Sequence, residues 1–308
     1  MDTKQILVIG ASNMDICAKS LAPIRKGDSN IGQVSMSSGG VGHNIAVALK
    51  RLGVNVQFLT AIADDSAGQA LSKSIKADGI ELLLPLISSS AYRTGIYSYI
   101  LDSNGTLLYG VNDMSINESI TSATVMFAND TIKSSDCVVF EANLSDGAIK
   151  ALVNMEGKFA ADCVSVVKAR KLRGVLDKPF LLKANYAEAC ELAGMRVNEN
   201  GEQDPYTVAQ KLAGKGLQRG LITLGSHGSF CFDVHAFENG GFEWYKMETP
   251  KDEVIINTNG CGDAFFAGFL KSYLEDGNLK KALEFGQSIA SANARTNEAV
   301  TKELFTIS

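Results

Sequence analysis

Short apolar runs that end at glycine or at a polar residue alternate along this chain with segments of helical apolar spacing. The first run, Ile6 to Gly10, is unbroken, as is typical of a strand buried on both faces. Asn44 to Leu52 then places apolar residues three and four positions apart, and Gly53 ends it. Parallel strands need crossover helices, and those helices cover the sheet. The alternation therefore predicts an α/β fold with a central, mostly parallel sheet flanked by helices on both faces.

The same alternation continues along the chain. The other expected strands are 56–62, 137–140, 159–161, 180–182 and 220–224, and the other expected helices are 66–77, 145–153, 263–273 and 279–295. No linker-like segment separates these elements, and no internal repeat is visible. We therefore expect one α/β domain over residues 1–308.

Two segments do not follow this pattern. Residues 29–36 and 94–111 alternate apolar and polar side chains as exposed strands do, and the second contains the turn Asp102-Ser103-Asn104-Gly105. They predict a small antiparallel sheet built from two insertions, at about 17–37 and 92–113. We expect this sheet to form a lid on the main body.

Composition and charge exclude several classes of protein. With 45% hydrophobic and 20% charged residues, the chain is too apolar to be disordered. Its net charge of −5 leaves no basic excess for a polynucleotide or an anionic membrane. No apolar run approaches the ~20 residues of a membrane span, and no signal segment opens the chain. We expect a cytoplasmic protein with neither a polynucleotide nor a membrane partner.

The six cysteines do not predict a metal site. None forms a CxxC pair, and the histidines lie far from them in the sequence. Reduced thiols in the core are therefore the expectation.

One glycine-rich segment lies before a C-terminal helix. Gly260, Cys261 and Gly262 precede Asp263, which opens an amphipathic period. Such a loop aims backbone N–H groups at one point, and the helix dipole adds positive potential there, so the loop can bind an anion. Asp263 is then a candidate proton acceptor. An ordinary helix start with Asp263 as a capping acid explains the same residues about as well.

A second glycine-rich segment opens the first helix. Gly39, Gly40 and Gly42 lie within four residues and let a ligand approach the backbone closely. Asn44 follows and offers both a donor and an acceptor to hydroxyl groups. Taken alone, this segment is better explained by close packing of a helix against a strand.

Together the two segments resemble motifs of the ribokinase-like, or PfkB, carbohydrate kinases, and the resemblance covers nearly the whole chain. That family carries a GGxxxN element and a GAGD element, which correspond here to residues 39–44 and 260–263. Three other family motifs occur in order: a sugar-binding loop at 10–15, an NxxE motif at 185–188 and a TxGxxG motif at 223–228. The resemblance implies a ribokinase-like fold and a lid that covers the substrate.

The resemblance also implies an ATP-dependent kinase that uses Mg²⁺. Asp263 would be the catalytic base, and the amides of Gly260, Cys261 and Gly262 would neutralise charge on the transferred group. Glu188 and Asn185 would hold Mg²⁺ through water. The residues implied for ATP binding are Asn185, Thr223, Gly225, Gly228, Asn293 and Asn297.

Within the family, the chain most resembles the members that phosphorylate the nucleoside pseudouridine on its 5′-hydroxyl. The resemblance rests on residues 28–30, 39–46, 112–114 and 164–168. A uracil ring presents acceptors and donors, which the amide of Asn112 and the carboxylate of Asp113 could pair, although both residues are also good turn formers. The implied substrate-binding residues are Asn13, Asp15, Ser29, Gly39, Gly40, Val41, Asn44, Thr94, Asn112, Asp113, Met114, Asn143 and Lys168.

Other readings remain open. The acceptor could be another nucleoside or a free sugar such as ribose or fructose, and a non-catalytic ligand sensor is a further alternative. Asn257 stands where the family usually has Asp, which leaves dependence on a monovalent cation open. Cys261 replaces the usual Ala, and we expect a packing role for it rather than a reactive thiol. The resemblance also implies a homodimer formed through the lid.

Overall fold

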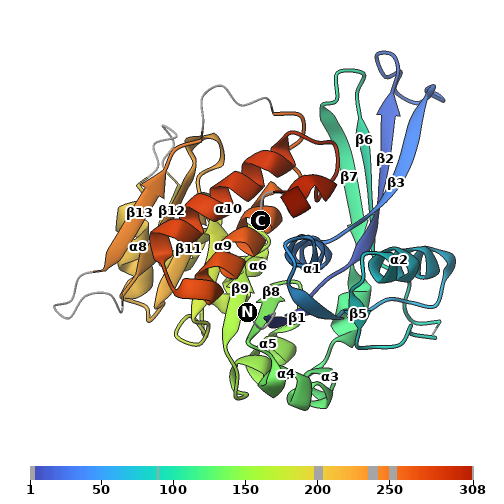
Figure 1. The fold of residues 1–308 in the computed structure, drawn as a ribbon. Coiled ribbons are helices and arrows are strands. Elements are labelled where there is room, and N and C mark those ends of the chain that lie inside the picture. Colours follow the sequence, from blue (N-terminus) through green and yellow to red (C-terminus); the bar gives the residue numbers. More distant parts are fainter. Residues whose placement is uncertain (1–3, 89, 198–203, 235–241, 250–254, 307–308) are drawn as a thin grey trace.

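The computed structural model describes residues 4–88, 90–197, 204–234, 242–249 and 255–306. Two sheets organise these residues, and helices cover both faces of the larger one, while the smaller sheet projects to one side (Figure 1). No helix in these ranges is both long and apolar enough to cross a bilayer. The α/β architecture expected from the sequence, a mostly parallel sheet covered by helices with a smaller separate sheet, is confirmed.

The larger sheet has the strand order β13-β12-β11-β10-β9-β8-β1-β4-β5. Its strands are β1 (Gln5–Ile9), β4 (Asn55–Leu59), β5 (Glu81–Leu82), β8 (Cys137–Glu141), β9 (Phe159–Asp162), β10 (Leu181–Asn185), β11 (Arg219–Thr223), β12 (Ser229–Asp233) and β13 (Glu243–Met247). All neighbouring pairs from β5 to β11 in this order are parallel, whereas β12 is antiparallel to both of its neighbours, β11 and β13. The chain leaves β1 toward β4 and later returns to β8 on the other side. In such sheets a ligand crevice forms beyond the carboxyl ends of the strands at this switch point.

The helices pack in two layers. They are α1 (Val41–Arg51), α2 (Ser66–Ala77), α3 (Ser122–Phe127), α4 (Asn129–Ser134), α5 (Asp146–Val153), α6 (Val166–Ala169), α7 (Tyr186–Ala193), α8 (Pro205–Ala213), α9 (Cys261–Asp276) and α10 (Leu279–Ala294). Short 3-10 turns occupy η1 (Ser115–Ser119), η2 (Arg170–Leu172), η3 (Gly225–His227) and η4 (Lys302–Thr306). Most predicted elements are confirmed, although α1 begins three residues before Asn44 and β4 ends at Leu59 rather than Ile62.

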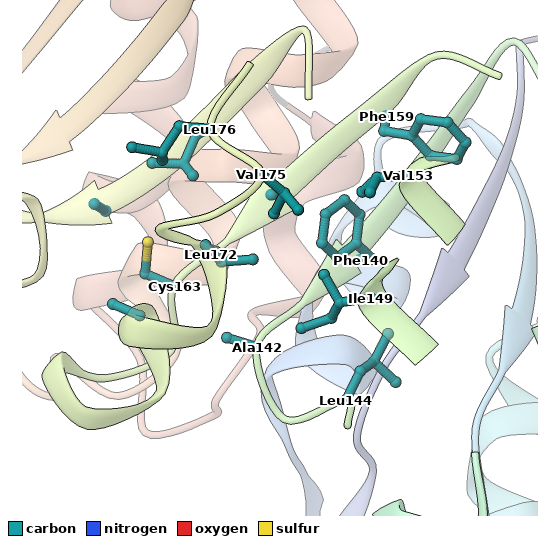
Figure 2. Close-up of a cluster of buried hydrophobic side chains, with 14 of the residues drawn as sticks. Phe140, Ala142, Leu144, Ile149, Val153, Phe159, Cys163, Leu172, Val175 and Leu176 are labelled. Carbon is teal, nitrogen blue, oxygen red and sulfur yellow. The ribbon is translucent and has the colours of Figure 1, made fainter. Parts of the chain in front are cut away.

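A buried apolar cluster lies on each face of the larger sheet. In β1, Leu7 and Ile9 belong to one cluster, whereas Ile6 and Val8 belong to the other. This explains the unbroken apolar run, because alternate side chains of one strand enter different layers. Figure 2 shows part of the first cluster, where Phe140 of β8 lies beside Ile149 of α5. The opposite cluster joins the sheet to α1, α2, α9 and α10.

The smaller sheet has the order β3-β2-β6-β7 and consists of β2 (Asn13–Ser20), β3 (Gly32–Gly39), β6 (Ile96–Leu101) and β7 (Leu107–Asp113). The predicted turn between β6 and β7 is confirmed, since the Gly105 N–H donates to the carbonyl of Asp102 over 3.1 Å. The fully antiparallel prediction is wrong for the central pair, because β2 and β6 are parallel. These two strands are not joined by a hairpin; β3, α1, β4, α2 and β5 lie between them in the chain.

The start of the smaller sheet also differs from the sequence prediction. Asn13 and Asp15 lie on β2, not in a loop after the first strand. The third strand covers 32–39 rather than 29–36, so Ser29 lies in the exposed turn between β2 and β3.

Candidate active site

Three charged side chains lie side by side at the carboxyl edge of the larger sheet. Glu141 of β8 is in register with Asp162 of β9, which is in register with Lys183 of β10. Residues in register on neighbouring strands point to the same face, so the three form one row, which we call the charged row. All three are buried, and isolated buried charges are costly, so the row must be paired internally or by ligands.

Glu141 ties two loops together at one end of the charged row. Its Oε1 accepts a hydrogen bond from the Ala11 N–H over 2.5 Å, and its Oε2 accepts one from the Asn143 N–H over 2.6 Å. Burial raises the pKa of Glu141 to about 7, even though both hydrogen bonds lower it. The loop after β1 and the loop after β8 are thus held around one carboxyl group.

Lys183 and Asp162 form an ion pair in the row. Lys183 Nζ lies 2.9 Å from Asp162 Oδ2, while Asp162 Oδ1 accepts from the Val164 N–H over 2.7 Å. Burial alone would lower the pKa of Lys183, but the carboxylates of Asp162, Asp263 and Glu188 raise it above its ordinary value. The ammonium group therefore stays charged and neutralises part of the surrounding acid.

The chain turns sharply just after Asp162. Val164 has φ 64°, and the Ser165 N–H donates to the Cys163 carbonyl over 2.7 Å, which closes a three-residue turn. A β-branched residue in this left-handed conformation is strained, at a cost of about 1–3 kcal/mol. The turn leads directly into α6, which carries Lys168.

The predicted anion-binding loop forms the start of α9. Gly260 precedes the helix with φ 72°, and a Cβ there would lie only 1.9 Å from the Ala299 carbonyl oxygen. A Cβ on Gly262 would lie 3.2 Å from Lys183 Nζ, so the ammonium group sits beneath the first turn. The first N–H groups of a helix have no intrahelical partner. Those N–H groups and Lys183 together place several hydrogen-bond donors at one point.

Asp263 lies on that first turn and is almost fully buried. Its Oδ2 accepts a hydrogen bond from Asn44 Nδ2 over 2.8 Å. Burial raises the pKa of Asp263 to about 7; the neighbouring Lys183 opposes this shift, and the carboxyl group of Asp162 adds to it. A carboxyl group with a pKa near neutral is suited to accept a proton at ordinary pH.

Glycines bring the smaller sheet and α1 close to this point. A Cβ on Gly39 would lie 2.3 Å from Asp15 Oδ2, and one on Gly42 would lie 2.9 Å from the backbone of Gly10. The packing explanation for this glycine-rich segment is therefore confirmed at Gly42. Asp15 accepts from Asn13 Nδ2 over 2.5 Å, and burial raises its pKa.

The register of the smaller sheet places polar groups on one face. Asp15 of β2 is in register with Tyr97 of β6, which is in register with Asn112 of β7. With strands about 4.8 Å apart, Asp15 and Asn112 are separated by roughly 10 Å across the sheet. We call this polar row, which also contains Ser37 of β3, the polar face.

A cavity of about 380 Å³ adjoins the start of α9. It is lined by residues from β11, the following turn, α9 and α10: Thr223, Gly225, Ser226, Gly228, Ser229, Thr249, Ile255, Thr258, Cys261, Gly262, Phe265, Gln287, Ala290, Ser291 and Ala294. Three of the predicted ATP-binding residues, Thr223, Gly225 and Gly228, thus meet here. Asn185, another of them, lies at the end of the neighbouring strand β10.

Asn293, predicted to lie near adenine, is not among the residues that line this cavity. Its side chain is fully buried, donating to the carbonyl of Ala299 over 3.0 Å and accepting from the Thr301 N–H over 2.8 Å. Ala290, Ser291 and Ala294 of the same helix line the cavity instead. Asn297 is exposed, and its carbonyl accepts a hydrogen bond from Asn257.

A second cavity, of about 560 Å³, lies between the end of β7 and the loop after β8. Most of its lining residues are polar: Asn112, Met114, Asn117, Glu118, Asn143, Ser145, Asp146, Lys168 and Lys171. Lys168 donates a hydrogen bond to Asn143 Oδ1, and burial lowers its pKa. Asn112, Met114, Asn143 and Lys168, all predicted from the resemblance, are therefore brought together.

Three other predicted substrate residues are not placed as expected. Asp113 is exposed and accepts hydrogen bonds from Ser115, as the turn alternative requires. Thr94 is buried and bonds Asp65, so its hydroxyl anchors the start of α2. Ser29 lies beyond the far end of the β2–β3 hairpin, before Gly32, the first residue of β3, whereas Asp15 pairs with Ser37.

The predicted metal motif is a helix start. Asn185 Oδ1 accepts from the Glu188 N–H over 2.9 Å, and Glu188 Oε2 accepts from the Asn185 N–H over 2.8 Å. Among the described residues, no cluster of three His, Cys, Asp or Glu side chains could hold a metal by itself. A carboxylate keeps lone pairs beyond these two contacts, which fits an ion held mainly by water and phosphate oxygens.

Sequence reasoning missed Glu141, Asp162 and Lys183 as site residues. A signal was present, because each follows a short apolar run that ends at the carboxyl edge of a predicted parallel strand. It also missed Tyr97, whose place between Asp15 and Asn112 depends on strand register.

The chain is similar to known kinases over almost its entire length. The profile of the pfkB family carbohydrate kinases matches residues 3–304. A pseudouridine kinase of Escherichia coli (strain K12) is 29% identical over 288 residues, covering 93% of this chain and 89% of that protein.

Two solved structures share the fold. A carbohydrate kinase from Agrobacterium tumefaciens superposes with a TM-score of 0.83 at 26% identity, covering 99% of this chain and 96% of that one. A ribokinase of Arabidopsis thaliana complexed with ribose and ATP gives a TM-score of 0.80 at 18% identity, covering 99% and 98%.

Proposed function

The chain belongs to the pfkB family of carbohydrate kinases and is a phosphotransferase acting on a sugar or nucleoside hydroxyl, and from that premise we propose that it phosphorylates pseudouridine. In this reaction the 5′-hydroxyl oxygen attacks the γ-phosphorus of ATP, the bond to ADP breaks, and the hydroxyl proton passes to Asp263. The products are pseudouridine 5′-phosphate and ADP.

One observation carries the catalytic part of this proposal: a carboxyl group with a pKa raised to about 7 directly follows an anion-binding helix start. The amides near Gly260, Cys261 and Gly262 and the ammonium group of Lys183 are placed to stabilise negative charge on the transferred phosphoryl group. Asp263 is on the same turn, so it reaches the attacking hydroxyl beside that group. Positioning and charge stabilisation supply most of the catalysis in phosphoryl transfer.

We assign each of the two cavities to a different substrate. The cavity beside Thr223 and Gly225 continues to the start of α9 and suits ATP, with its phosphates on the glycine-rich loop. When bound, Mg²⁺ would neutralise the phosphate oxygens. Glu188 and Asn185 are the residues that would hold that ion through water.

The polar face of the smaller sheet suits a nucleoside better than a free sugar. Asp15 and Asn44 would bind ribose hydroxyls, with the backbone at Gly39, Gly40 and Val41 beside them. Asn112 lies across the sheet from Asp15 and lines the polar cavity. Their separation of roughly 10 Å corresponds to a ribose plus a base ring.

The lining of the polar cavity matches a uracil ring. Lys168 and Lys171 can donate to ring carbonyls, and Asn112 and Asn143 can pair either kind of group. The carboxylates of Glu118 and Asp146 can accept from ring N–H groups. Pseudouridine is linked through carbon and so exposes two such N–H groups, whereas uridine exposes one. This balance favours pseudouridine over the alternative acceptors, which are another nucleoside, ribose or fructose.

A substrate panel tests the assignment. ADP release should be measured with pseudouridine, uridine, cytidine, adenosine, ribose and fructose at equal concentrations. We expect the highest kcat/KM for pseudouridine. A higher value for ribose or fructose would reject the nucleoside assignment, and absence of turnover with every acceptor would support a ligand sensor.

A variant tests the base contact separately. Asn112→Ala should lower kcat/KM for pseudouridine by about 10-fold, as expected for one lost hydrogen bond to a ring group, and leave ribose turnover unchanged. Ser103→Ala, in the β6–β7 turn, is the control. An equal loss with both acceptors would show that Asn112 does not contact the base.

We propose that the enzyme acts as a homodimer through the smaller sheet. Opposite the polar face, Val34, Met36, Ile100, Tyr109 and Val111 form an exposed apolar face across three strands. β3 and β7 are the edges of this sheet, so a second copy can cover the same surface about a twofold axis. The sheet would then act as a lid that excludes water from the transferred phosphate.

We also propose that catalysis does not depend on a monovalent cation. Asn257 Nδ2 donates to the Asn297 carbonyl over 3.3 Å, and Asn257 Oδ1 accepts from the Asn259 N–H over 2.9 Å. The Asn297 carbonyl oxygen, which could otherwise bind a cation, thus accepts a hydrogen bond from the Asn257 amide. Position 257 also carries no carboxylate that would attract a cation. Replacing K⁺ with tetramethylammonium should leave kcat unchanged; a loss of more than about fivefold would contradict this.

A further inference from the structure

His43 is a buried titratable residue that the proposed mechanism does not use. It lies on the first turn of α1, next to Asn44, and its ring is almost fully buried. Its Nδ1 lies 3.3 Å from Asn44 Oδ1. Its Nε2 is buried and has no hydrogen-bond partner among the described residues. A buried polar atom left unpaired is uncommon and calls for a compensating role.

The contact with Asn44 defines the tautomer of the ring. An amide oxygen can only accept a hydrogen bond, so Nδ1 must carry the hydrogen. Burial lowers the pKa of His43, so the ring is neutral and has only one N–H. Nε2 is therefore an acceptor that stays without a donor among the described residues, the cost of holding the ring with Nδ1–H toward Asn44.

The same contact fixes the amide of Asn44. With Oδ1 facing the imidazole N–H, Nδ2 faces Asp263 Oδ2 at 2.8 Å. When Asp263 is ionised, as a proton acceptor must be, the opposite orientation would place two acceptors together on the Asp263 side. With Nδ1 protonated, it would also place two donors together on the His43 side. For that state of the site, only the observed orientation satisfies both contacts.

We propose that His43 is a positioning residue for catalysis: its Nδ1–H locks the Asn44 amide so that it donates to one oxygen of Asp263 and leaves the other for the substrate hydroxyl. This inference rests on the proposed role of Asp263 as the base. It adds a third member, His43, to the pair Asn44–Asp263. It also means that Asn44 presents N–H, not oxygen, toward the sugar.

The hydrogen-bonded chain His43–Asn44–Asp263 lies among five charged groups. Around Asp263 these are Lys183 of β10, Asp162 of β9 and Glu141 of β8. Around His43 they are Asp78 after α2 and Arg51 of α1. Changing His43 leaves all five charges in place, so an effect on Asp263 must pass through Asn44.

Two variants separate hydrogen bonding from packing. His43→Leu fills the site without a donor, whereas His43→Asn places an amide N–H near the position of Nδ1. We expect His43→Leu to lower kcat by about tenfold, with KM for ATP unchanged. The Asn44–Asp263 bond lowers the pKa of Asp263, so His43→Leu should also shift the acidic limb of the kcat–pH profile to higher pH. His43→Asn should recover most of both effects.

Controls distinguish this role from a structural one. Ile45→Val removes one methylene from the same buried helix and should leave the pH profile unchanged. If His43→Leu keeps the wild-type kcat and pH midpoint, or if His43→Asn is as impaired as His43→Leu, the positioning role is rejected.

A readout independent of activity keeps the test separate from the proposed reaction. In the ¹⁵N-histidine-labelled full chain, His43 should give the signature of a neutral ring protonated at Nδ1, assigned by its disappearance in His43→Asn. Protonation at Nε2 would overturn the inference even in an active enzyme. If Nδ1 is protonated but no acceptor is phosphorylated, the hydrogen-bond arrangement of His43, Asn44 and Asp263 is supported and the proposed function is rejected.

Discussion

Asp263, the proposed base, has an environment that links activity to stability. Burial raises its pKa to about 7, so the folded protein binds this proton more tightly than the unfolded chain does. Its contribution to stability is therefore full below about pH 4 and is lost as the pH rises through 7. Ionised Asp263 therefore lowers the free energy of unfolding in the neutral pH range, where the proposed base has to be deprotonated.

Asp263→Asn should show both consequences. We expect kcat to fall by about 10²- to 10⁴-fold, because the proton acceptor is lost. We also expect the variant to unfold at a higher temperature than wild type, by a margin that is larger at pH 8 than at pH 5. Thermal denaturation at both pH values and ADP release check these outcomes.

The second half of this prediction depends on the sign of the change with pH. Glu141 also has a raised pKa and interacts with Asp263, so the comparison reports the two carboxyl groups together. A margin that shrinks as the pH rises would mean that Asp263 is stabilised, not penalised, in its ionised form.

Lys183 is expected to matter for folding as well as for charge. Lys183→Met leaves Asp162 as an unpaired buried carboxylate, which should destabilise the protein by about 3–5 kcal/mol. The double variant Asp162→Asn, Lys183→Met removes both charges and should recover much of that loss. Urea denaturation of the two single variants and the double variant gives the coupling energy, and additive losses would show that the pair is not coupled.

At the scale of elements, the start of α9 depends on backbone shape. Gly260 and Gly277 flank this helix, with φ 72° and φ 70°. A Cβ on Gly260 would meet the Ala299 carbonyl at 1.9 Å, whereas a Cβ on Gly277 meets nothing within 4 Å. Both glycines thus have a left-handed backbone, but only at Gly260 does another part of the chain occupy the space of a side chain.

Gly260→Ala and Gly277→Ala form a matched pair. Both pay about 1 kcal/mol for the left-handed conformation, but only Gly260→Ala must also displace the loop at Ala299. We expect Gly277→Ala to keep the wild-type kcat and Gly260→Ala to lose at least tenfold. Equal kcat values for the two variants would show that the loop before α9 does not have to keep its shape.

The sequence predicted these elements well because their signals are local. Helices such as α2 and α10 and strands such as β1 and β8 follow directly from apolar periodicity. The motif match predicts a loop at Asn13 and Asp15, although both lie at the start of β2. Polar residues there mask the strand pattern, and the parallel partner strand, β6, lies far along the chain. The parallel pairing of β2 with β6 has no local signature at all.

The site was predicted less completely for the same reason. Glycine spacing predicts the loop at 260–263, and the family resemblance implies the cavity residues Asn112, Asn143 and Lys168. The ends of the apolar runs mark Glu141, Asp162 and Lys183 one by one, but only strand register shows that the three are neighbours. The resemblance also assigns Asn293 to adenine, because a polar residue near a helix end gives no hint that its amide is fully used internally.

For the whole molecule, the two faces of the smaller sheet have different expected partners. Val34→Lys puts a charge on the apolar face, so it should shift the protein from dimer to monomer in light scattering. Gln33→Lys, one residue earlier and on the opposite face, should leave the mass unchanged. A monomeric wild-type protein would contradict the proposed dimer, whatever the variants do.

The distribution of the six cysteines has a practical consequence. Cys137, Cys163, Cys190 and Cys231 are buried, whereas Cys17 on β2 and Cys261 at the start of α9 are partly exposed. A mild alkylating reagent should therefore modify the natural chain at two positions, one on the smaller sheet and one at the start of α9. Added nucleotide should slow labelling at Cys261, and added acceptor should slow it at Cys17. Mass spectrometry of the two peptides would thus give the order of substrate binding without any substitution in the protein.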